Sequence, residues 1–294
     1  MKQTGTLDVS PISNLAQAID HLTATFSAAG IEDSRASARI LVCGAACLSN
    51  LDLLTSPSRS LQPETARKIL NYMERRLARE PVSRILGRRD FWNVSLEIQP
   101  GVLDPRADTE RLIEVCLSRN SVSQCRQILD AGVGSGAILC ALLTNLSDAA
   151  GIGLDISIKA CEAARENLQD LGLAERSSIV HCDFADYTEH GFDLVVSNPP
   201  YICSSEIAGL EPEVALYDPL IALDGGADGL SAYRVLIGKL PVWLKPGGVF
   251  AVEIGFDQAA SVTRMLREAG LREVIVTQDY NGLDRVISGL AVGA

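Results

Sequence analysis

Apolar residues recur every three or four positions in the first third of the chain, as they do in helices that bury one face. The first such stretch stops at Gly30, and a second covers about residues 33–48. A third opens at Pro63, a residue that suits the first position of a helix, and ends or kinks at Pro81. These segments predict a small bundle of helices.

The segment 90–100 alternates apolar and polar residues and is rich in strand-forming side chains. It predicts a β-hairpin, followed by a helix over 109–117. We therefore expect a helical domain over residues 1–87, a hairpin linker over 88–104 and a larger domain over 105–294.

From residue 127 onward the pattern changes to strands that alternate with helices. Such alternation predicts an α/β domain whose mostly parallel sheet is covered by helices on both faces. The connection between the last two strands is too short for a crossover helix, so this final pair is expected to be antiparallel. The expected strands are 127–133, 151–156, 177–183, 192–198, 249–255, 273–279 and 285–290, and the expected helices are 136–146, 158–171, 229–244 and 258–269.

Hydrophobic residues make up 47% of the 294 residues, which is enough to form a substantial core. No apolar run reaches the ~18 residues that a membrane span needs, and the segment MKQTGTLDVSPIS has no apolar core of a secretory signal. The eight cysteines are scattered without paired Cys-x-x-Cys motifs, so neither a bound metal nor a disulfide framework is expected. These features predict a cytoplasmic protein, and a monomer is expected.

Charge is unevenly distributed along the chain. Residues 1–90 carry a net charge of +3 and residues 91–294 a net charge of −14, which together give the total of −11. A nucleic-acid substrate requires basic residues to bind its phosphates. The acidic character of the larger domain therefore argues against direct nucleic-acid binding.

A glycine-rich loop with the sequence GVGSG, residues 132–136, follows the first strand of the expected sheet. Glycines at such a turn let the backbone approach a ligand closely, and Asp155 at the end of the next strand suits ribose hydroxyls. Asp183 and Phe184 follow the third strand, where they could bind and stack on an adenine. These residues fit any adenosine-bearing cofactor.

Asp130, just before the glycines, narrows the choice of cofactor. An acid at this position would repel the pyrophosphate of a dinucleotide. It would instead suit a ligand with an amino group and no phosphate, such as S-adenosylmethionine. We therefore expect this cofactor, with S-adenosylhomocysteine as its product.

The tetrapeptide Asn198-Pro199-Pro200-Tyr201 ends the fourth strand, at the same edge of the sheet. A planar NH₂ group is a poor nucleophile, and two carbonyl acceptors would fix its nitrogen for methyl transfer. We expect the Asn198 side chain and the Pro199 backbone to supply these carbonyls, while Tyr201 stacks on the flat group. Alignment with the methyl group would then provide most of the acceleration, without a strong base.

These motifs resemble those of class I S-adenosylmethionine-dependent amino methyltransferases, which have a Rossmann-like seven-stranded sheet. Further blocks along the whole chain narrow the resemblance to the HemK/PrmC family. These blocks are Arg84–Gly87, Pro105-Arg106, Asp108–Glu110, Glu211–Val214, Leu223, Gly225-Gly226, Asp228–Leu230, Lys245–Gly248 and Glu253–Gly255.

The resemblance implies methylation of the glutamine side-chain amide in the Gly-Gly-Gln motif of peptide chain release factors. We also predict that the basic helical domain contacts the release factor away from that glutamine. The implied cofactor residues are Gly132, Val133, Gly134, Ser135, Gly136, Asp155, Asp183, Phe184 and Asn198. The implied catalytic residues are Asn198, Pro199 and Tyr201, and the implied substrate residues are Asn198, Pro199, Pro200 and Tyr201.

Four positions depart from the family pattern, namely Asp104, Ala107, Ala131 and Val133. These departures affect the expected geometry at the rim of the site. Arg106 and Glu110 border the site, and a simple salt link between them is the alternative to a functional role. Three alternative functions stay open: a glutamine methyltransferase of a ribosomal protein, an adenine-N6 methyltransferase of nucleic acid, and a non-catalytic module with an unused cofactor pocket.

Overall fold

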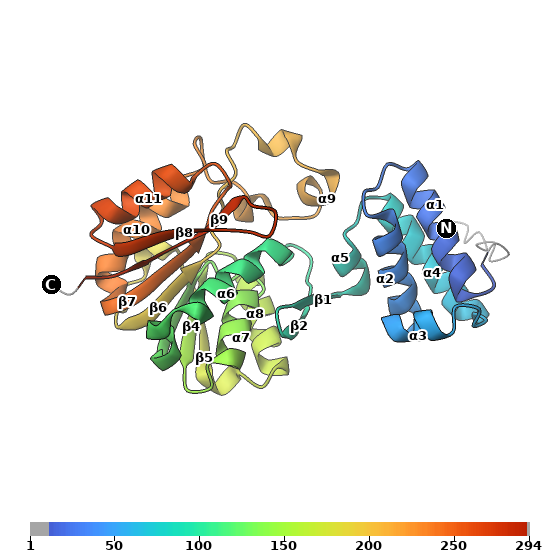
Figure 1. Ribbon diagram of the computed structural model, residues 1–294, viewed down its shortest axis with the longest axis horizontal. Coiled ribbons are helices and arrows are strands. Elements are labelled where there is room, and N and C mark those ends of the chain that lie inside the picture. Colours follow the sequence, from blue (N-terminus) through green and yellow to red (C-terminus); the bar gives the residue numbers. More distant parts are fainter. Residues whose placement is uncertain (1–11, 293–294) are drawn as a thin grey trace. The chain divides into compact units, whose positions relative to one another are not determined.

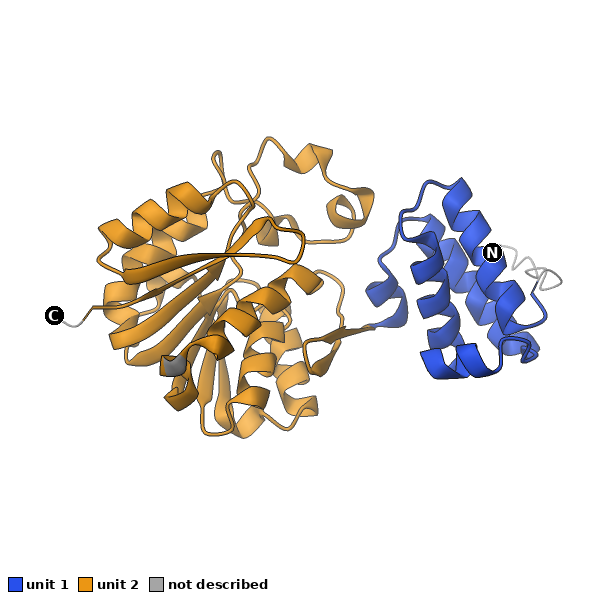
Figure 2. Ribbon diagram, in the orientation of Figure 1, with its two compact units in different colours: residues 1–87 blue, residues 88–294 orange. Residues whose placement is uncertain are grey.

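The computed structural model describes residues 12–292 of the chain. The chain divides into two compact units, residues 1–87 and residues 88–294, which are coloured separately in Figure 2. The β-hairpin belongs to the second unit. Each unit is described by itself below.

The first unit is a bundle of helices around its own apolar core. Asn14 begins the first helix by accepting a hydrogen bond from the Gln17 backbone N–H at 3.0 Å, and Gly30 follows its end in a left-handed conformation. Two short helices were not expected, because five or six residues are too few to display a periodic pattern. The helices are α1 (Leu15–Ala28), α2 (Ser34–Ala46), α3 (Asn50–Thr55), α4 (Pro63–Leu77) and α5 (Val82–Leu86).

The second unit begins with the predicted hairpin, formed by β1 (Arg88–Phe91) and β2 (Val94–Glu97). Its seven-stranded sheet has the order β5-β4-β3-β6-β7-β9-β8, and β9 is antiparallel to both neighbours. The mostly parallel sheet and its antiparallel last strand are therefore confirmed. Its strands are β3 (Gln127–Ala131), β4 (Ala150–Asp155), β5 (Ser177–His181), β6 (Phe192–Ser197), β7 (Leu244–Glu253), β8 (Arg272–Gln278) and β9 (Asp284–Leu290).

Helices cover both faces of this sheet (Figure 1). On β7, Val249 and Ala251 pack toward one helical layer, whereas Phe250 and Val252 pack toward the other. This alternation explains why the strand reads as a continuous apolar run. One layer contains α6 (Glu110–Ser118), α7 (Ala137–Asn145) and α8 (Ile158–Asp170), and the other contains α10 (Ser231–Trp243) and α11 (Ala259–Glu268).

Shorter elements connect these layers. The remaining helix α9 covers Pro212–Ala215, and 3₁₀ turns cover Ala107–Thr109, Asn120–Gln124, Ala174–Arg176, Phe184–Asp186, Ile207–Gly209 and Leu220–Ala222. Strand β7 starts five residues before the expected 249, since an irregularity in its pairing with β6 accommodates Pro246 and the two glycines that follow. None of the helices within residues 12–292 has the length and apolar character needed to cross a membrane.

The order of the strands locates the functional edge of the sheet. The chain runs outward from β3 through β4 to β5 and then returns to β6 on the other side of β3. Ligands of such sheets bind where this reversal leaves a crevice outside the carboxyl ends of the strands. Asp130 on β3 pairs with Val196 on β6, so the glycine loop and Asn198 leave the sheet side by side.

Candidate active site

The glycine loop turns tightly because three of its residues adopt left-handed backbone conformations. The φ angles of Gly132, Gly134 and Gly136 are 85°, 55° and 85°. A Cβ atom on Gly136 would lie 3.3 Å from the Ala164 Cα, so this glycine also lets α7 approach α8. The loop backbone therefore stays close to the carboxyl-terminal edge of the sheet, and a space remains above the loop.

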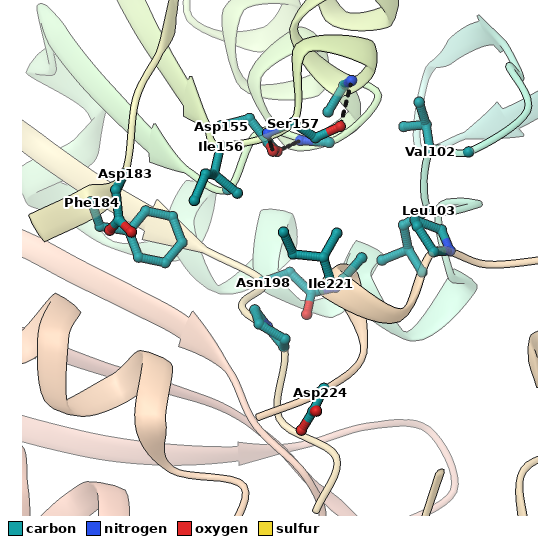
Figure 3. A pocket seen from close by; sticks show the side chains of 17 residues that line it. Val102, Leu103, Asp155, Ile156, Ser157, Asp183, Phe184, Asn198, Ile221 and Asp224 are labelled. Carbon is teal, nitrogen blue, oxygen red and sulfur yellow. Dashed lines mark hydrogen bonds between the residues drawn. The ribbon is translucent and has the colours of Figure 1, made fainter. Parts of the chain in front are cut away.

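A cavity of about 270 Å³ occupies that space (Figure 3). Apolar side chains form most of its wall, and carboxylates stand at separate points around it. Such a lining suits a flat ring system that carries a polar ribose. The predicted residues that line it are Gly132, Gly134, Asp155, Asp183, Phe184, Asn198 and Pro200, and others include Val102, Leu103, Ile156, Ile221, Ala222 and Asp224.

Asp155 is held firmly at the end of β4. Its Oδ2 accepts the Gly134 N–H at 2.9 Å, and its Oδ1 accepts the Ser157 N–H at 2.8 Å. Burial raises the pKa of Asp155, while these two hydrogen bonds oppose that rise. Each carboxylate oxygen retains a lone pair, so Asp155 can still accept from two ribose hydroxyls.

Phe184 and Ile156 provide apolar surfaces for a ring (Figure 3). Asp183 accepts the Ala185 N–H at 2.9 Å, which closes the 3₁₀ turn that presents the Phe184 side chain. An added Cβ on Gly132 would lie 3.6 Å from the Phe184 ring, so the loop and the ring face each other closely. An adenosine group fits this combination of acid, ring and glycine backbone.

The other loop residues of the predicted set do not line this cavity. Val133 points into the core, where its Cγ2 would lie 2.6 Å from a Cβ on Gly153. The Ser135 backbone carbonyl accepts the Asn167 side-chain amide at 2.9 Å. Val133, Ser135 and Gly136 thus hold the shape of the loop, and the departure at Val133 removes nothing from the cavity wall.

Asp130 is not placed as the sequence suggested. It is completely buried beside α7 and lies outside the cavity lining. Burial raises its pKa well above the ordinary value, because a charged carboxylate is poorly solvated there. Asp130 therefore does not line the cavity as the sequence interpretation assumed, and the cofactor assignment depends on the other residues.

A second cavity, of about 180 Å³, lies on the other side of Asn198. Pro199 and Tyr201 line it, whereas Pro200 lines the first cavity. Three residues belong to the walls of both cavities, namely Leu103, Asn198 and Ala222. Asn198 therefore lies where the contents of the two cavities would meet.

The Asn198 side chain is oriented by a residue from a distant part of the chain. Its Nδ2 donates to the Thr109 Oγ1 at 3.0 Å, and Thr109 is almost completely buried. Because the amide nitrogen is engaged there, the Oδ1 is left to accept a hydrogen bond from a ligand.

Buried polar groups hold the Tyr201 end of the tetrapeptide. The Gln258 Nε2 donates to the Tyr201 backbone carbonyl at 2.9 Å, and the Gln258 Oε1 accepts from the Tyr233 hydroxyl at 3.1 Å. A Cβ on Gly229 would lie only 2.5 Å from the Tyr201 carbonyl oxygen, so only glycine fits there. The Tyr201 hydroxyl donates to the Glu253 Oε1 at 3.4 Å.

Glu253 is the most perturbed acid near the tetrapeptide. Its burial raises the pKa of the carboxyl to about 7, although Thr109, Arg285 and Tyr201 lower it. Arg285 also pairs with Asp279 at 3.1 Å. Glu253 is therefore close to an even balance between its charged and neutral forms at physiological pH.

Arg106 and Glu110 do not form the salt link considered above. Arg106 pairs with the buried Asp218, and the Glu110 Oε1 accepts the Trp92 N–H at 3.0 Å. Asp104, which replaces the usual apolar residue, is buried and lies 3.5 Å from the Arg89 guanidinium. Nearby opposite charge thus accommodates the acid at position 104.

Several residues of the site had no role in the sequence interpretation. Thr109 and Glu253 lie in sequence blocks that were used only to support the resemblance to the HemK/PrmC family. Ile221 lies in the 3₁₀ turn before Leu223. Glu253 carried a usable signal, because it is a single acid at the carboxyl end of an apolar strand. Ile221 carried none.

Comparison with known proteins agrees with this geometry. Residues 17–87 match the model of the PrmC N-terminal domain, and residues 107–209 match that of the methyltransferase small domain. A release factor glutamine methyltransferase from Caulobacter vibrioides is 43% identical over 263 residues, which cover 89% of this chain and 91% of that protein. The chain belongs to the PrmC family of S-adenosylmethionine-dependent release factor glutamine methyltransferases.

Other members of the family are similarly close. The enzyme of the same name from Rhodospirillum rubrum is 43% identical, over 93% of this chain and 84% of its own length. The enzyme of the same name from Vibrio cholerae is 34% identical, over 92% of this chain and 95% of its own length. Among solved structures, the hMettl16 catalytic domain matches with a TM-score of 0.55 over 80% of this chain and 87% of its own, at 14% identity, which shows a common fold.

Proposed function

We propose that this chain transfers the methyl group of S-adenosylmethionine to the side-chain amide nitrogen of the glutamine in the Gly-Gly-Gln motif of peptide chain release factors. The relatives are named release factor glutamine methyltransferases. The observation that supports it best is the pair of cavities that share Leu103, Asn198 and Ala222. One cavity suits an adenosine group, and Asn198 and Pro199 line the other.

The first cavity would hold the cofactor, which supplies an electrophilic methyl group on a sulfonium. Asp155 would accept hydrogen bonds from its ribose, and Asp183 would accept one from the adenine amino group. Phe184 and Ile156 would enclose the ring. Gly132 and Gly134 would allow the methionine part to lie against the loop backbone.

The second cavity would hold the glutamine side chain. The Asn198 Oδ1 would accept one N–H of the substrate amide, and the Pro199 carbonyl would accept the other. Two fixed acceptors favour the positive charge that develops on the nitrogen while it attacks the methyl group. Tyr201 would form the wall beside the flat amide, and the proton would leave to water after transfer.

Other parts of the chain support a protein substrate. We propose that the helical unit, residues 1–87, contacts the release factor away from its glutamine. The net charge of −14 over residues 91–294 disfavours the alternative of a nucleic-acid adenine. We also propose that the enzyme acts in the cytoplasm, since release factors act in translation and all eight cysteines, which lie within the described residues, are free.

A labelling experiment tests this function. The protein is incubated with S-adenosylmethionine labelled in its methyl group and with a release factor that carries either its loop glutamine or alanine there. Label is expected only on the factor with glutamine. Equal labelling of both factors, or of neither, would contradict the proposed function. A ribosomal protein with surface glutamines serves as the competing substrate.

A further inference from the structure

Glu253 is a buried acid that the mechanism above does not use. It is the last residue of β7, and only 1% of its surface is exposed. Its Oε1 accepts from the Tyr201 hydroxyl at 3.4 Å, but its Oε2 has no hydrogen-bond partner among residues 12–292. A buried carboxylate oxygen without a donor is costly, which suggests that it has a function.

Thr109 lies between Glu253 and Asn198. Its hydroxyl accepts from the Asn198 Nδ2 at 3.0 Å. The same hydroxyl lowers the pKa of the Glu253 carboxyl, whose buried Oε2 has no other donor among the described residues. Catalytic hydrogen bonds often become well aligned only in the complex with substrate.

The number of protons on these groups sets the orientation of Asn198. The hydroxyl of a threonine has one proton. When that proton points to a carboxylate, only oxygen lone pairs remain for Asn198, so the asparagine must present its NH₂ group to Thr109. Its carbonyl then points away from Thr109 and toward the ligand.

We propose that ionised Glu253 acts through Thr109 as a positioning group, which keeps the Asn198 carbonyl directed at the substrate amide. This inference rests on the proposed function of the site. A protonated Glu253 would donate to Thr109, whose own proton would then turn toward Asn198. The asparagine amide would be free to rotate and present its NH₂ group to the NH₂ group of the substrate, where no hydrogen bond can form.

The charged groups around Glu253 come from several elements. Arg285 on β9 favours the ionised form, whereas Asp108, in the 3₁₀ turn before α6, opposes it. Asp279, before β9, shares Arg285 at 3.1 Å and so weakens its effect on Glu253. Tyr201 keeps its proton, because burial raises its pKa, and therefore remains a donor to Glu253. The Tyr233 hydroxyl on α10 shares its one proton between the Glu253 backbone carbonyl, at 3.0 Å, and the Gln258 Oε1, at 3.1 Å.

Three variants of the full-length enzyme separate positioning from simple structural support. Thr109→Val removes the hydroxyl and keeps the shape, Thr109→Ser retains the hydroxyl, and Glu253→Gln removes the ionisation. Thr263→Val is the control for loss of a buried hydroxyl, because the Thr263 hydroxyl on α11 is also buried but lies outside both cavities and lacks a partner among the described residues. The assay measures kcat and KM for a release factor from pH 5.5 to pH 9 with saturating S-adenosylmethionine.

For the wild type, kcat/KM is expected to rise with pH and level off above about pH 7, where Glu253 is ionised. Thr109→Val should lower kcat about tenfold, the effect of one hydrogen bond, and leave cofactor affinity within about twofold. Thr109→Ser should retain the wild-type profile, and Thr263→Val should not differ from wild type. In Glu253→Gln, kcat/KM should no longer rise with pH. The double variant with Thr109→Val and Glu253→Gln should have the same kcat as Thr109→Val alone.

The proposal is overturned if Glu253→Gln keeps the rise with pH, if Thr109→Val has wild-type kcat, or if Thr109→Ser is as impaired as Thr109→Val. Should Glu253→Gln fail to fold, the two Thr109 variants decide the matter alone. If the wild-type enzyme transfers no methyl group to any release factor, the proposed function fails instead, so the two failures are distinguishable.

Discussion

The Asn198 side-chain nitrogen lies 3.0 Å from the Thr109 hydroxyl, although 89 residues separate the two in the chain. Thr109 ends the 3₁₀ turn before α6, and Asn198 follows β6. This bond leaves the asparagine oxygen as the free end of the amide, at the wall that two cavities share. The orientation of one side chain thereby links the cofactor cavity to the substrate cavity.

Asn198→Ala should bind S-adenosylmethionine normally and lose turnover. Removal of one aligned polar group at a reacting centre costs about 2.7–4 kcal/mol, or about 10²–10³ in kcat. Cofactor affinity can be measured by titration calorimetry, and turnover by methyl transfer to a release factor. Asn145→Ala, at an exposed position near the end of α7, is the control. Unchanged turnover in Asn198→Ala would dismiss its role in holding the amide.

Asp155→Asn should weaken cofactor binding without changing affinity for the release factor. The substitution removes a charged acceptor, and hydrogen bonds to charged groups contribute about 1.5–3 kcal/mol, which corresponds to a loss of about 10- to 100-fold in affinity. Asp148→Asn is the matched control, because Asp148 is exposed and pairs with Arg126. Equal effects of the two substitutions would remove Asp155 from the cofactor site.

Gly132→Ala should impair cofactor binding by a combination of strain and crowding. The φ angle of 85° is unfavourable for alanine by about 1–2 kcal/mol. The new Cβ would contact the Phe184 ring at 3.6 Å, and because both residues line the cavity, it would take space from a ligand there. Gly191→Ala is a control for strain alone, since its φ is 94° and the nearest side-chain atom is 3.9 Å away, on Lys245. Similar cofactor affinities in both variants would show that crowding at Gly132 is unimportant.

The raised pKa of Glu253 predicts how stability depends on pH. Folding raises this pKa from an ordinary 4.5 to about 7, so the contribution of the protonated form is fully present below pH 4.5 and is lost as the pH rises through 7. The loss amounts to about 3 kcal/mol. Glu253→Gln should therefore be as stable as the wild type at pH 4.5 and more stable at pH 8, as measured by urea unfolding. An equal difference at both pH values would contradict this assignment.

Much of the fold can be predicted from the sequence, because alternating strands and helices extend over many residues and identify themselves by their periods. The candidate cofactor residues are also predictable, since the glycine loop, Asp155 and Phe184 each follow a strand directly. Short helices such as α3 are not predictable in this way. Neither is the burial of Asp130, because its sequence position does not reveal which face of β3 carries its side chain.

The relation between Asn198, Thr109 and Glu253 also lies beyond the sequence. Each residue stands in a segment that the sequence places on a different element, and no local pattern connects them. Only the strand order brings β6 and β7 together, and only the packing of α6 against β7 brings Thr109 near them. Long-range packing of this kind decides which of the noted residues act together.

A crystal structure of the enzyme with S-adenosylhomocysteine and a peptide that contains Gly-Gly-Gln tests the central claim most directly. The account predicts the adenosine beside Asp155 and Phe184, and the glutamine nitrogen within hydrogen-bond distance of the Asn198 Oδ1. The sulfur should lie in line with that nitrogen through the shared wall of the two cavities. Adenosine bound elsewhere, or an Asn198 oxygen turned away from the glutamine, would contradict it.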